Sequence, residues 1–240
     1  MQCVILAGGL ATRMRPHTEH IPKALLPVAG KPFVERQLEW LSKHGVTEVL
    51  FLTGYLGEQI EQAVGDGNRW GLKVRYSQED ILLGTGGALR LAADRGLLRP
   101  KFLLTYCDSY LRVDFGKIFQ KFEKCGSLAL MTVIRNDFRC ASSNVIFEAG
   151  QLSLYDKRAG EANQKRMEFL DYGLLALTAT AVTERLEAGK KLDLSDFLHV
   201  LSKEGRLVGM EVSEKYYEIG SPEGLNDIEE FFQKRGENLD

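Results

Sequence analysis

The feature that most constrains the fold is a pair of glycines, residues 8–9, directly after a short apolar run, residues 3–7. The apolar run predicts a buried strand, and the glycines end it abruptly while letting the backbone approach a ligand closely. Successive N–H groups in such a turn form a concavity suited to phosphate oxygens. Arg13 and Lys23 follow, each close to prolines that stiffen the chain. This combination predicts a polyphosphate site.

Two common phosphate motifs do not describe this turn. A Walker motif closes with Gly-Lys-Ser/Thr, whereas residues 11–13 read Ala-Thr-Arg. The dinucleotide fingerprint requires glycines at its first, third and sixth positions, which residues 8–10 do not supply.

The composition excludes several other classes of protein. With 44% hydrophobic and 27% charged residues in 240, the chain is typical of a globular protein with a sizeable core. A net charge of −2 gives no reason to expect a nucleic-acid partner or a membrane surface, and without a long apolar run we expect a cytoplasmic protein. His17 and His20 have the wrong spacing for a zinc protease and are interpreted as loop residues. Four cysteines without a CxxC pair are interpreted as buried reduced thiols: Cys3, Cys107, Cys125 and Cys140.

Beyond the turn, apolar periodicity predicts alternating strands and helices. The expected strands are residues 46–52, 72–76, 102–106 and 128–134, and the expected helices are 32–43, 58–64, 84–94 and 114–124. This alternation implies an α/β fold with a mainly parallel sheet covered by helices on both faces. Ligands of such sheets bind outside the carboxyl ends of the strands. The glycine turn, residues 84–87 and Asp108 all follow predicted strands, so we expect them at one edge.

The pattern changes after residue 135, where strands become more frequent. We expect a hairpin over 145–155, strands over 169–177, 206–212 and 216–219, and helices over 179–188, 194–204 and from Pro222 onward. Asp193 is expected to cap the second of these helices. The polar residues 160–166 predict a mobile loop without secondary structure. No repeat or linker occurs, so residues 1–240 are expected to form one domain with halves 1–135 and 136–240.

The first segment resembles the signature of the sugar-1-phosphate nucleotidyltransferases, also called NDP-sugar pyrophosphorylases. Members carry Leu-Ala-Gly-Gly-x-Gly-Thr-Arg-Leu-x-Pro and then Pro-Lys-Pro-Leu-Leu-Pro-Val. Residues 6–16 and 22–28 match, except that Ala11 and Ala24 replace a glycine and a proline. The resemblance implies a Rossmann-like, GT-A-like fold with a smaller β-rich sugar-binding part. It also implies transfer of a nucleoside monophosphate from an NTP to a sugar 1-phosphate, with Mg²⁺ as cofactor and pyrophosphate as product.

The resemblance also implies roles for individual residues. Arg13 and Lys23 are the expected catalytic cations, and Asp108 and Glu218 the expected metal ligands. Nucleotide binding is expected from Leu6, Ala7, Gly8, Gly9, Ala11, Thr12, Gly84, Thr85 and Gly86. Sugar-phosphate binding is expected from Gly87, Asn144, Lys157, Asp171 and Gly173.

Four of these positions depart from the family's pattern or have another interpretation. Glu218 stands where the family has aspartate, and its extra methylene moves the carboxylate. Asp171 replaces an asparagine, which removes a hydrogen-bond donor while keeping acceptors. Asn144 is equally well interpreted as a turn residue. If the backbone at Ala11 is left-handed, the alanine costs about 1–2 kcal/mol.

Residues 83–88, Leu-Gly-Thr-Gly-Gly-Ala, resemble the loop of guanylyltransferases for mannose and heptose phosphates. We therefore expect GTP and a manno-configured sugar 1-phosphate. CTP or UTP with another sugar or choline phosphate is the alternative, and a non-catalytic homologue that senses these ligands is the second. A glycosyltransferase is disfavoured because Asp108 is not part of an Asp-x-Asp motif. A homo-oligomer is left open.

Overall fold

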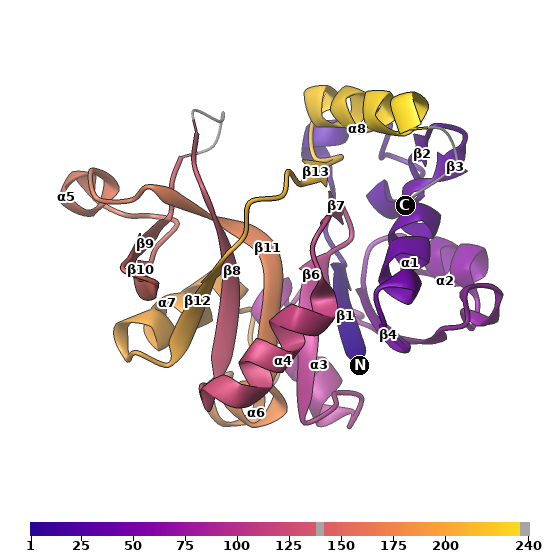
Figure 1. Ribbon diagram of the computed structural model, residues 1–240. Helices are drawn as coiled ribbons and strands as arrows, with labels where there is room; N and C mark the ends of the chain where they lie inside the picture. The colour runs from indigo at the N-terminus through magenta and orange to yellow at the C-terminus, as the bar shows by residue number, and fades with distance from the viewer. Residues whose placement is uncertain (138–141, 236–240) are drawn as a thin grey trace.

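A nine-stranded sheet crosses the molecule and carries helices on both faces (Figure 1). It is seen in a computed structural model that describes residues 1–137 and 142–235, so Cys140 lies outside the described residues. The strands follow the order β10 (Gln151–Tyr155), β9 (Val145–Glu148), β11 (Phe169–Thr178), β6 (Lys101–Tyr106), β1 (Gln2–Ala7), β4 (Glu48–Thr53) and β5 (Lys73–Gln78). β8 (Ala129–Arg135) pairs with β11 and with β12 (Leu207–Glu211).

The central strands β6, β1, β4 and β5 are parallel, which confirms the predicted α/β class. β11 runs antiparallel to both β6 and β8, and β9 and β10 form an antiparallel hairpin. The strands of the second half are therefore mostly antiparallel and lie to one side of the parallel core (Figure 1).

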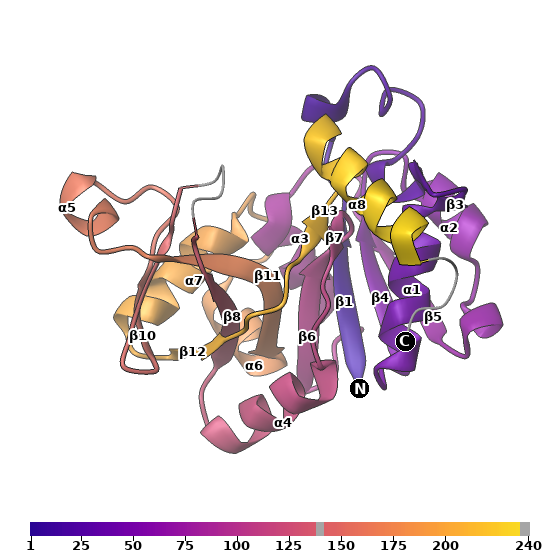
Figure 2. The same cartoon turned by 45° about the horizontal axis from the view of Figure 1, so that its top comes forward.

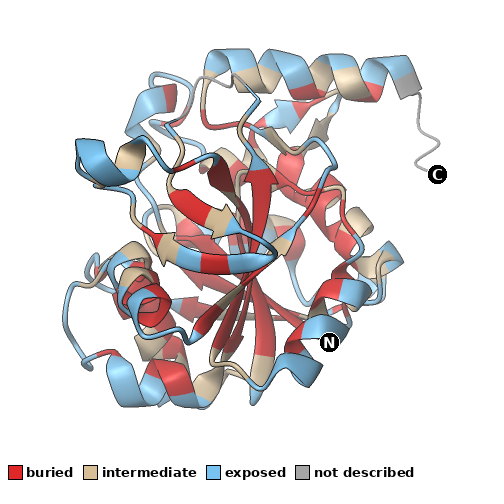
Figure 3. Cartoon of the chain, turned by 60° about the vertical axis from the view of Figure 1, so that its left-hand side comes forward, coloured by how far each residue is buried: buried red, intermediate tan, exposed pale blue. Residues whose placement is uncertain are grey.

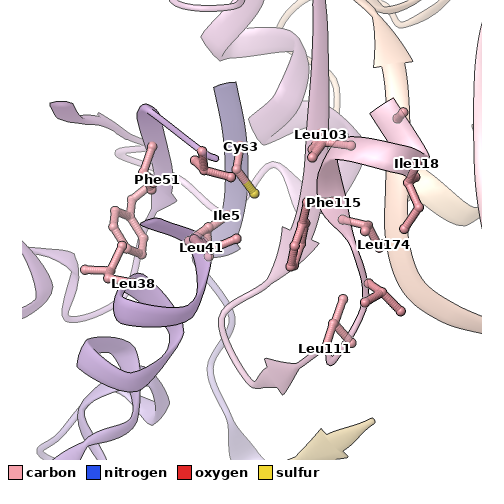
Figure 4. Close-up of a cluster of buried hydrophobic side chains, with 14 of the residues drawn as sticks. Cys3, Ile5, Leu38, Leu41, Phe51, Leu103, Leu111, Phe115, Ile118 and Leu174 are labelled. Carbon is pink, nitrogen blue, oxygen red and sulfur yellow. The ribbon is translucent and has the colours of Figure 1, made fainter. Parts of the chain in front are cut away.

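Alternating side chains of β1 explain the two helical layers, because successive residues of a strand point to opposite faces. Cys3 and Ile5 pack with the helices α1 (Phe33–Lys43), α2 (Gly57–Val64) and α4 (Phe115–Cys125). Figure 4 shows Leu38 and Leu41 of α1 against this face. Val4 and Leu6 pack with α3 (Gly84–Asp94), α6 (Ala179–Arg185) and α7 (Leu194–Lys203). Buried residues accordingly fill the centre and exposed ones the outside (Figure 3).

Side-chain caps fix where three helices begin, each accepting a hydrogen bond from an N–H of the first turn. Asp193 accepts from the N–H of Ser195, as the predicted cap of α7. Asp114 accepts from Lys117 at the start of α4, and the Thr178 hydroxyl caps α6.

Several short elements were not predicted. They are the 3₁₀ turns η1 (Thr12–Met14), η2 (Lys23–Leu25) and η3 (Asn68–Trp70), and the two-residue strands β2 (Pro27–Val28), β3 (Lys31–Pro32) and β7 (Ser109–Tyr110). The short strand β13 (Tyr217–Glu218) lies within the predicted strand 216–219. The final helix, α8 (Pro222–Arg235), lies over β13 and the β2–β3 hairpin (Figures 1 and 2). In this way α8 covers two segments that follow or carry predicted site residues.

Two predictions were wrong. The segment 160–166 is not without structure, because α5 (Glu161–Gln164) forms one exposed helical turn there. Cys125 is exposed at the end of α4 rather than buried, while Cys107 is half-buried. Cys3 is buried as expected, and burial raises the pKa of its thiol to about 12. In the part of the chain that the structure describes, no helix has the length and apolar character needed to cross a membrane.

Candidate active site

A pocket lies at the carboxyl ends of β1, β4 and β6, and the three predicted features meet there. It is lined by the glycine turn, by the start of α3 and by Asp108. The expectation that these segments converge on one edge of the sheet is thereby confirmed. The predicted residues that line the pocket are Leu6, Ala7, Gly8, Gly9, Ala11, Lys23, Gly84, Thr85 and Asp108.

The glycine turn lines this pocket with residues 8–11. The backbone N–H groups of Gly9, Leu10 and Ala11 donate to no group within the described residues. Ala11 has φ 48° and ψ 37°, so the left-handed conformation that penalises alanine is present. Its carbonyl accepts a hydrogen bond of 2.8 Å from the Thr18 hydroxyl and one of 3.0 Å from the N–H of Met14. These bonds hold the turn against its strain.

Four charged side chains from three separate segments meet beside the turn. The Lys23 Nζ lies 2.9 Å from Asp108 Oδ2. A Cβ built on Gly220 would lie 3.7 Å from both Asp108 Oδ2 and Glu218 Oε2, and 3.8 Å from a guanidinium nitrogen of Arg13. Gly220 thus marks a point around which both predicted metal ligands and both predicted cations gather.

A two-strand pairing explains how Glu218 reaches Asp108. In the antiparallel sheet of β7 and β13, Glu218 lies opposite Ser109, and the N–H of Ile219 donates to the Asp108 carbonyl at 2.9 Å. Burial, and then the nearby Asp108 carboxylate, raise the pKa of Glu218, whereas Arg13 and Lys23 oppose the rise. The ionised form of Glu218 is therefore disfavoured chiefly because its carboxylate is removed from water. Within the described residues, no cluster of three or more His, Cys, Asp or Glu side chains is arranged to hold a metal ion.

Glu79 lines the same pocket and was not predicted. Only 8% of it is exposed, and its Oε2 accepts a 2.9 Å hydrogen bond from the N–H of Leu83. Its Oε1 accepts no hydrogen bond from the described residues and lies 3.0 Å from where a Cβ would stand on Gly8 or Gly54. Burial raises the pKa of this carboxyl. The sequence signal was a pair of adjacent acids after β5, Glu79 and Asp80, which matches no phosphate or metal motif.

Residues 84–87 form the first turn of α3 and contact the segment that precedes α7. The N–H groups of Gly86 and Gly87 donate to the Leu192 carbonyl, at 2.9 and 3.3 Å. A Cβ on Gly87 would lie 2.5 Å from the Lys190 carbonyl. Gly84 and Thr85 line the pocket, but the N–H groups of Gly86 and Gly87 already donate to a carbonyl of the protein itself. The same contact brings Lys191, a second residue that was not predicted, to the pocket.

The predicted sugar-phosphate residues of the second half form a separate group. The Asn144 Oδ1 accepts from the N–H of Asp171 at 2.9 Å, and the Asp171 Oδ1 accepts from the N–H of Gly173 at 3.0 Å. Gly173 has φ 97° where the β11 register shifts, a conformation that favours glycine. Burial raises the pKa of Asp171, which the Lys157 charge and the Tyr155 hydroxyl counteract. Nine of the predicted site residues do not line the pocket: Thr12, Arg13, Gly86, Gly87, Asn144, Lys157, Asp171, Gly173 and Glu218.

Comparison with known proteins assigns this sequence to a family. The family model described as "Nucleotidyl transferase" matches residues 2–154. The chain belongs to the nucleotidyl transferase family. That assignment covers the parallel core, the glycine turn and Asp108.

Individual relatives differ in the nucleotide they are named for. The D-glycero-alpha-D-manno-heptose 1-phosphate guanylyltransferase of Campylobacter jejuni is 29% identical over 225 residues, 93% of this chain and 96% of the relative. The N-acetylmuramate alpha-1-phosphate uridylyltransferase of Neisseria meningitidis is 40% identical over 121 residues, 50% of this chain. This match spans only about half of the relative's length, 52%.

Among solved structures, the same fold occurs in HddC from Yersinia pseudotuberculosis, complexed with GMP-PN. It superposes with a TM-score of 0.79 at 24% identity, covering 96% of this chain and 99% of HddC. At this identity the match establishes the fold and leaves the ligand to the chemistry of the pocket.

Proposed function

We propose that this nucleotidyl transferase moves GMP from GTP to the phosphate of a manno-configured hexose or heptose 1-phosphate, releasing pyrophosphate. The observation that carries the proposal is the meeting of Arg13, Lys23, Asp108 and Glu218 beside a turn with free N–H groups. Cations and free amides are suited to phosphates. The name of the Campylobacter jejuni relative, a guanylyltransferase for a manno-heptose 1-phosphate, points the same way.

The reaction requires positioning and charge neutralisation more than proton transfer. A phosphate monoester has a second pKa near 6, so the sugar phosphate is already ionised at neutral pH and needs no general base. Its oxygen bonds to the α-phosphorus of GTP while the bond to the pyrophosphate oxygen breaks. Arg13 neutralises charge on the departing pyrophosphate, and Lys23 contacts the phosphates at the reacting centre. Lys157 binds the incoming phosphate, and Asp171 contacts the sugar.

Asp108 and Glu218 fit Mg²⁺, which proteins bind through one or two carboxylates together with substrate phosphates. When bound there, the ion would supply positive charge to the α-phosphate. The raised pKa of Glu218 agrees with this assignment, since two neighbouring carboxylates become more favourable once a divalent cation separates their charges.

Glu79 supports guanine as the base. Guanine carries adjacent donors, N1–H and the N2 amino group, and a carboxylate presents acceptors only. The free Oε1 of Glu79 in the pocket can accept from this edge, whereas adenine offers an acceptor at N1. Uracil has a single N3–H donor, so UTP is the second candidate, favoured by the similarity to the uridylyltransferase.

The proposal extends to the organisation and location of the protein. We infer that residues 1–240 act as one domain, because β11 and β9 from beyond residue 135 join the same sheet as β1 and β6. A cytoplasmic location is proposed because NTPs are made and used there. Nucleic acid and membrane have no part in the reaction.

Pyrophosphate release with Mg²⁺ tests the proposal. GTP, UTP, CTP, dTTP and ATP are each combined with mannose, heptose, glucose, N-acetylglucosamine and choline phosphates. The expected result is turnover with GTP and a manno-configured sugar phosphate, lost in Asp108→Asn. Turnover with another pair corrects the substrates. No turnover from folded protein that still binds a nucleotide would support the sensing homologue instead.

A further inference from the structure

The loop between α6 and α7 delivers a lysine to the nucleotide pocket from the second half of the chain. The exposed Lys191 lines this pocket beside Gly84 and Thr85. Within the described residues, its side chain makes neither an ion pair nor a hydrogen bond. The neighbouring Lys190 does not line the pocket, and its Nζ lies 3.7 Å from Glu187 Oε1. The two adjacent lysines thus differ in their surroundings.

Hydrogen bonds fix the residues that directly follow Lys191 in the chain. The Leu192 N–H donates to the Leu83 carbonyl at 2.8 Å, and the Leu192 carbonyl accepts from Gly86 and Gly87. The N–H of Leu194 donates to the Thr85 hydroxyl at 2.8 Å. These bonds attach the segment to the first turn of α3, so the position of the Lys191 backbone is set by the nucleotide-binding half.

The glycines of residues 84–87 are what permit this attachment. A Cβ on Gly84 would lie 2.6 Å from the Leu192 carbonyl oxygen, and one on Gly87 would lie 2.5 Å from that of Lys190. Real Cβ atoms essentially never approach backbone oxygens so closely. The glycine-rich motif therefore joins the two halves of the chain, in addition to lining part of the pocket.

We propose that Lys191 is a phosphate-binding residue of this pocket, placed there by the docking of residues 190–194 on residues 84–87. This rests on the proposed function, because the anions of both substrates are phosphates. The other cation that lines the pocket, Lys23, already has Asp108 at 2.9 Å. Lys191 instead contributes charge that no anion within the described residues balances.

The test compares Lys191→Met with Lys190→Met. For the NTP that the wild-type protein binds most tightly among the five, calorimetry measures the dissociation constants of the triphosphate and of its nucleoside. We expect Lys191→Met to raise the dissociation constant of the triphosphate about fivefold, as for the loss of one exposed ion pair. The nucleoside should bind unchanged, Lys191→Arg should retain the affinity, and Lys190→Met should match the wild type.

The KM of the sugar phosphate distinguishes the two sources of phosphate. A rise in this KM alone would assign Lys191 to the sugar phosphate rather than to the NTP, and would still support phosphate binding. Equal behaviour of Lys191→Met and Lys190→Met toward both ligands would overturn the proposal. If the protein binds another NTP more tightly than GTP, the proposed nucleotide is wrong. Lys191→Met and Lys190→Met are then compared with that nucleotide. If the protein binds no phosphate ligand at all, both the proposed function and the proposed role of Lys191 are wrong.

A second comparison tests the docking. Gly87→Ala introduces a methyl group against the Lys190 carbonyl, whereas Gly160→Ala, at a site with open space, is the control. We expect Gly87→Ala to weaken triphosphate binding and to add no further loss when Lys191→Met is already present. Thr85→Val removes the bond from Leu194 without a clash, and serves if Gly87→Ala does not fold. If the losses of triphosphate affinity in the two single variants add fully in the double variant, the docking role is contradicted.

Discussion

Ala11 carries a left-handed backbone at the centre of the glycine turn, and this strain can be measured. Glycine relieves about 1–2 kcal/mol of strain but makes the unfolded chain more flexible, at a cost of about 0.4–1 kcal/mol. We expect Ala11→Gly to raise the free energy of unfolding by roughly 0.5–1 kcal/mol in denaturant titrations. Ala149→Gly is the control, because Ala149 has φ 50° in the turn between β9 and β10.

Both variants should gain stability, but only Ala11→Gly should change the KM for the NTP. The methyl group of Ala11 lies in the pocket lining, whereas Ala149 does not. An unchanged KM would mean that the turn accepts the methyl group without loss of nucleotide binding.

Glu79 provides a prediction about the base. In Glu79→Gln one carboxylate oxygen becomes an amino group, which cannot accept from guanine but can donate to a carbonyl of uracil. We expect the KM for GTP to rise about tenfold, as for one lost hydrogen bond to a charged group, while that for UTP rises less. Steady-state kinetics with both nucleotides measure the ratio. If the two KM values rise equally, Glu79 supports the turn without reading the base.

Glu218 gives the reaction a pH dependence. Burial and Asp108 raise its pKa above the ordinary 4.5, so its ionised form, to which we attribute metal binding, is lost at a higher pH than for an exposed glutamate. We expect kcat/KM to fall as the pH drops through this raised value. Glu218→Gln should lower turnover about a hundredfold and abolish this acid limb. Glu214→Gln, at an exposed position outside the charged group, should leave the profile unchanged.

Two helix caps, one that contacts a pocket residue and one that does not, separate an effect on stability from an effect on the site. Asp193 caps α7 and also accepts a 3.3 Å hydrogen bond from Thr85, whereas Asp114 caps α4 on the opposite face of the sheet. Replacing either by alanine should cost about 1 kcal/mol in thermal unfolding. Only Asp193→Ala should raise the KM for a substrate. A KM change in Asp114→Ala would show that loss of stability alone affects the site.

The elements that the sequence predicted are those long enough to show a period. The strands β1 and β4 are continuous apolar runs, and the helices α1 and α4 repeat apolar residues over two or more turns, so the positions of all four follow from burial alone. β7 has two residues and was not predicted, because only its pairing with β13 defines it. The turn at α5 was missed because its residues are polar and none is buried.

The same limit applies to the site. The sequence predicted Arg13, Lys23 and Asp108 because they lie in a long motif beside recognisable strands. It missed Glu79 and Lys191, which reach the pocket through contacts with residues distant in sequence. It also gave residues 86–87 a direct role at the ligand, since nothing in the motif indicates that the Leu192 carbonyl occupies their N–H groups.

For the whole molecule, the order of charged residues along the chain has a consequence for synthesis. The ribosome produces Arg13 and Lys23 early, Asp108 midway and Glu218 only near residue 220, on a strand whose partner β7 was made long before. A nascent chain that has completed the parallel core therefore lacks Lys191 from the pocket lining and Glu218 from the group of charged side chains. The charged group to which we attribute catalysis is completed only after both halves of the sheet have been synthesised.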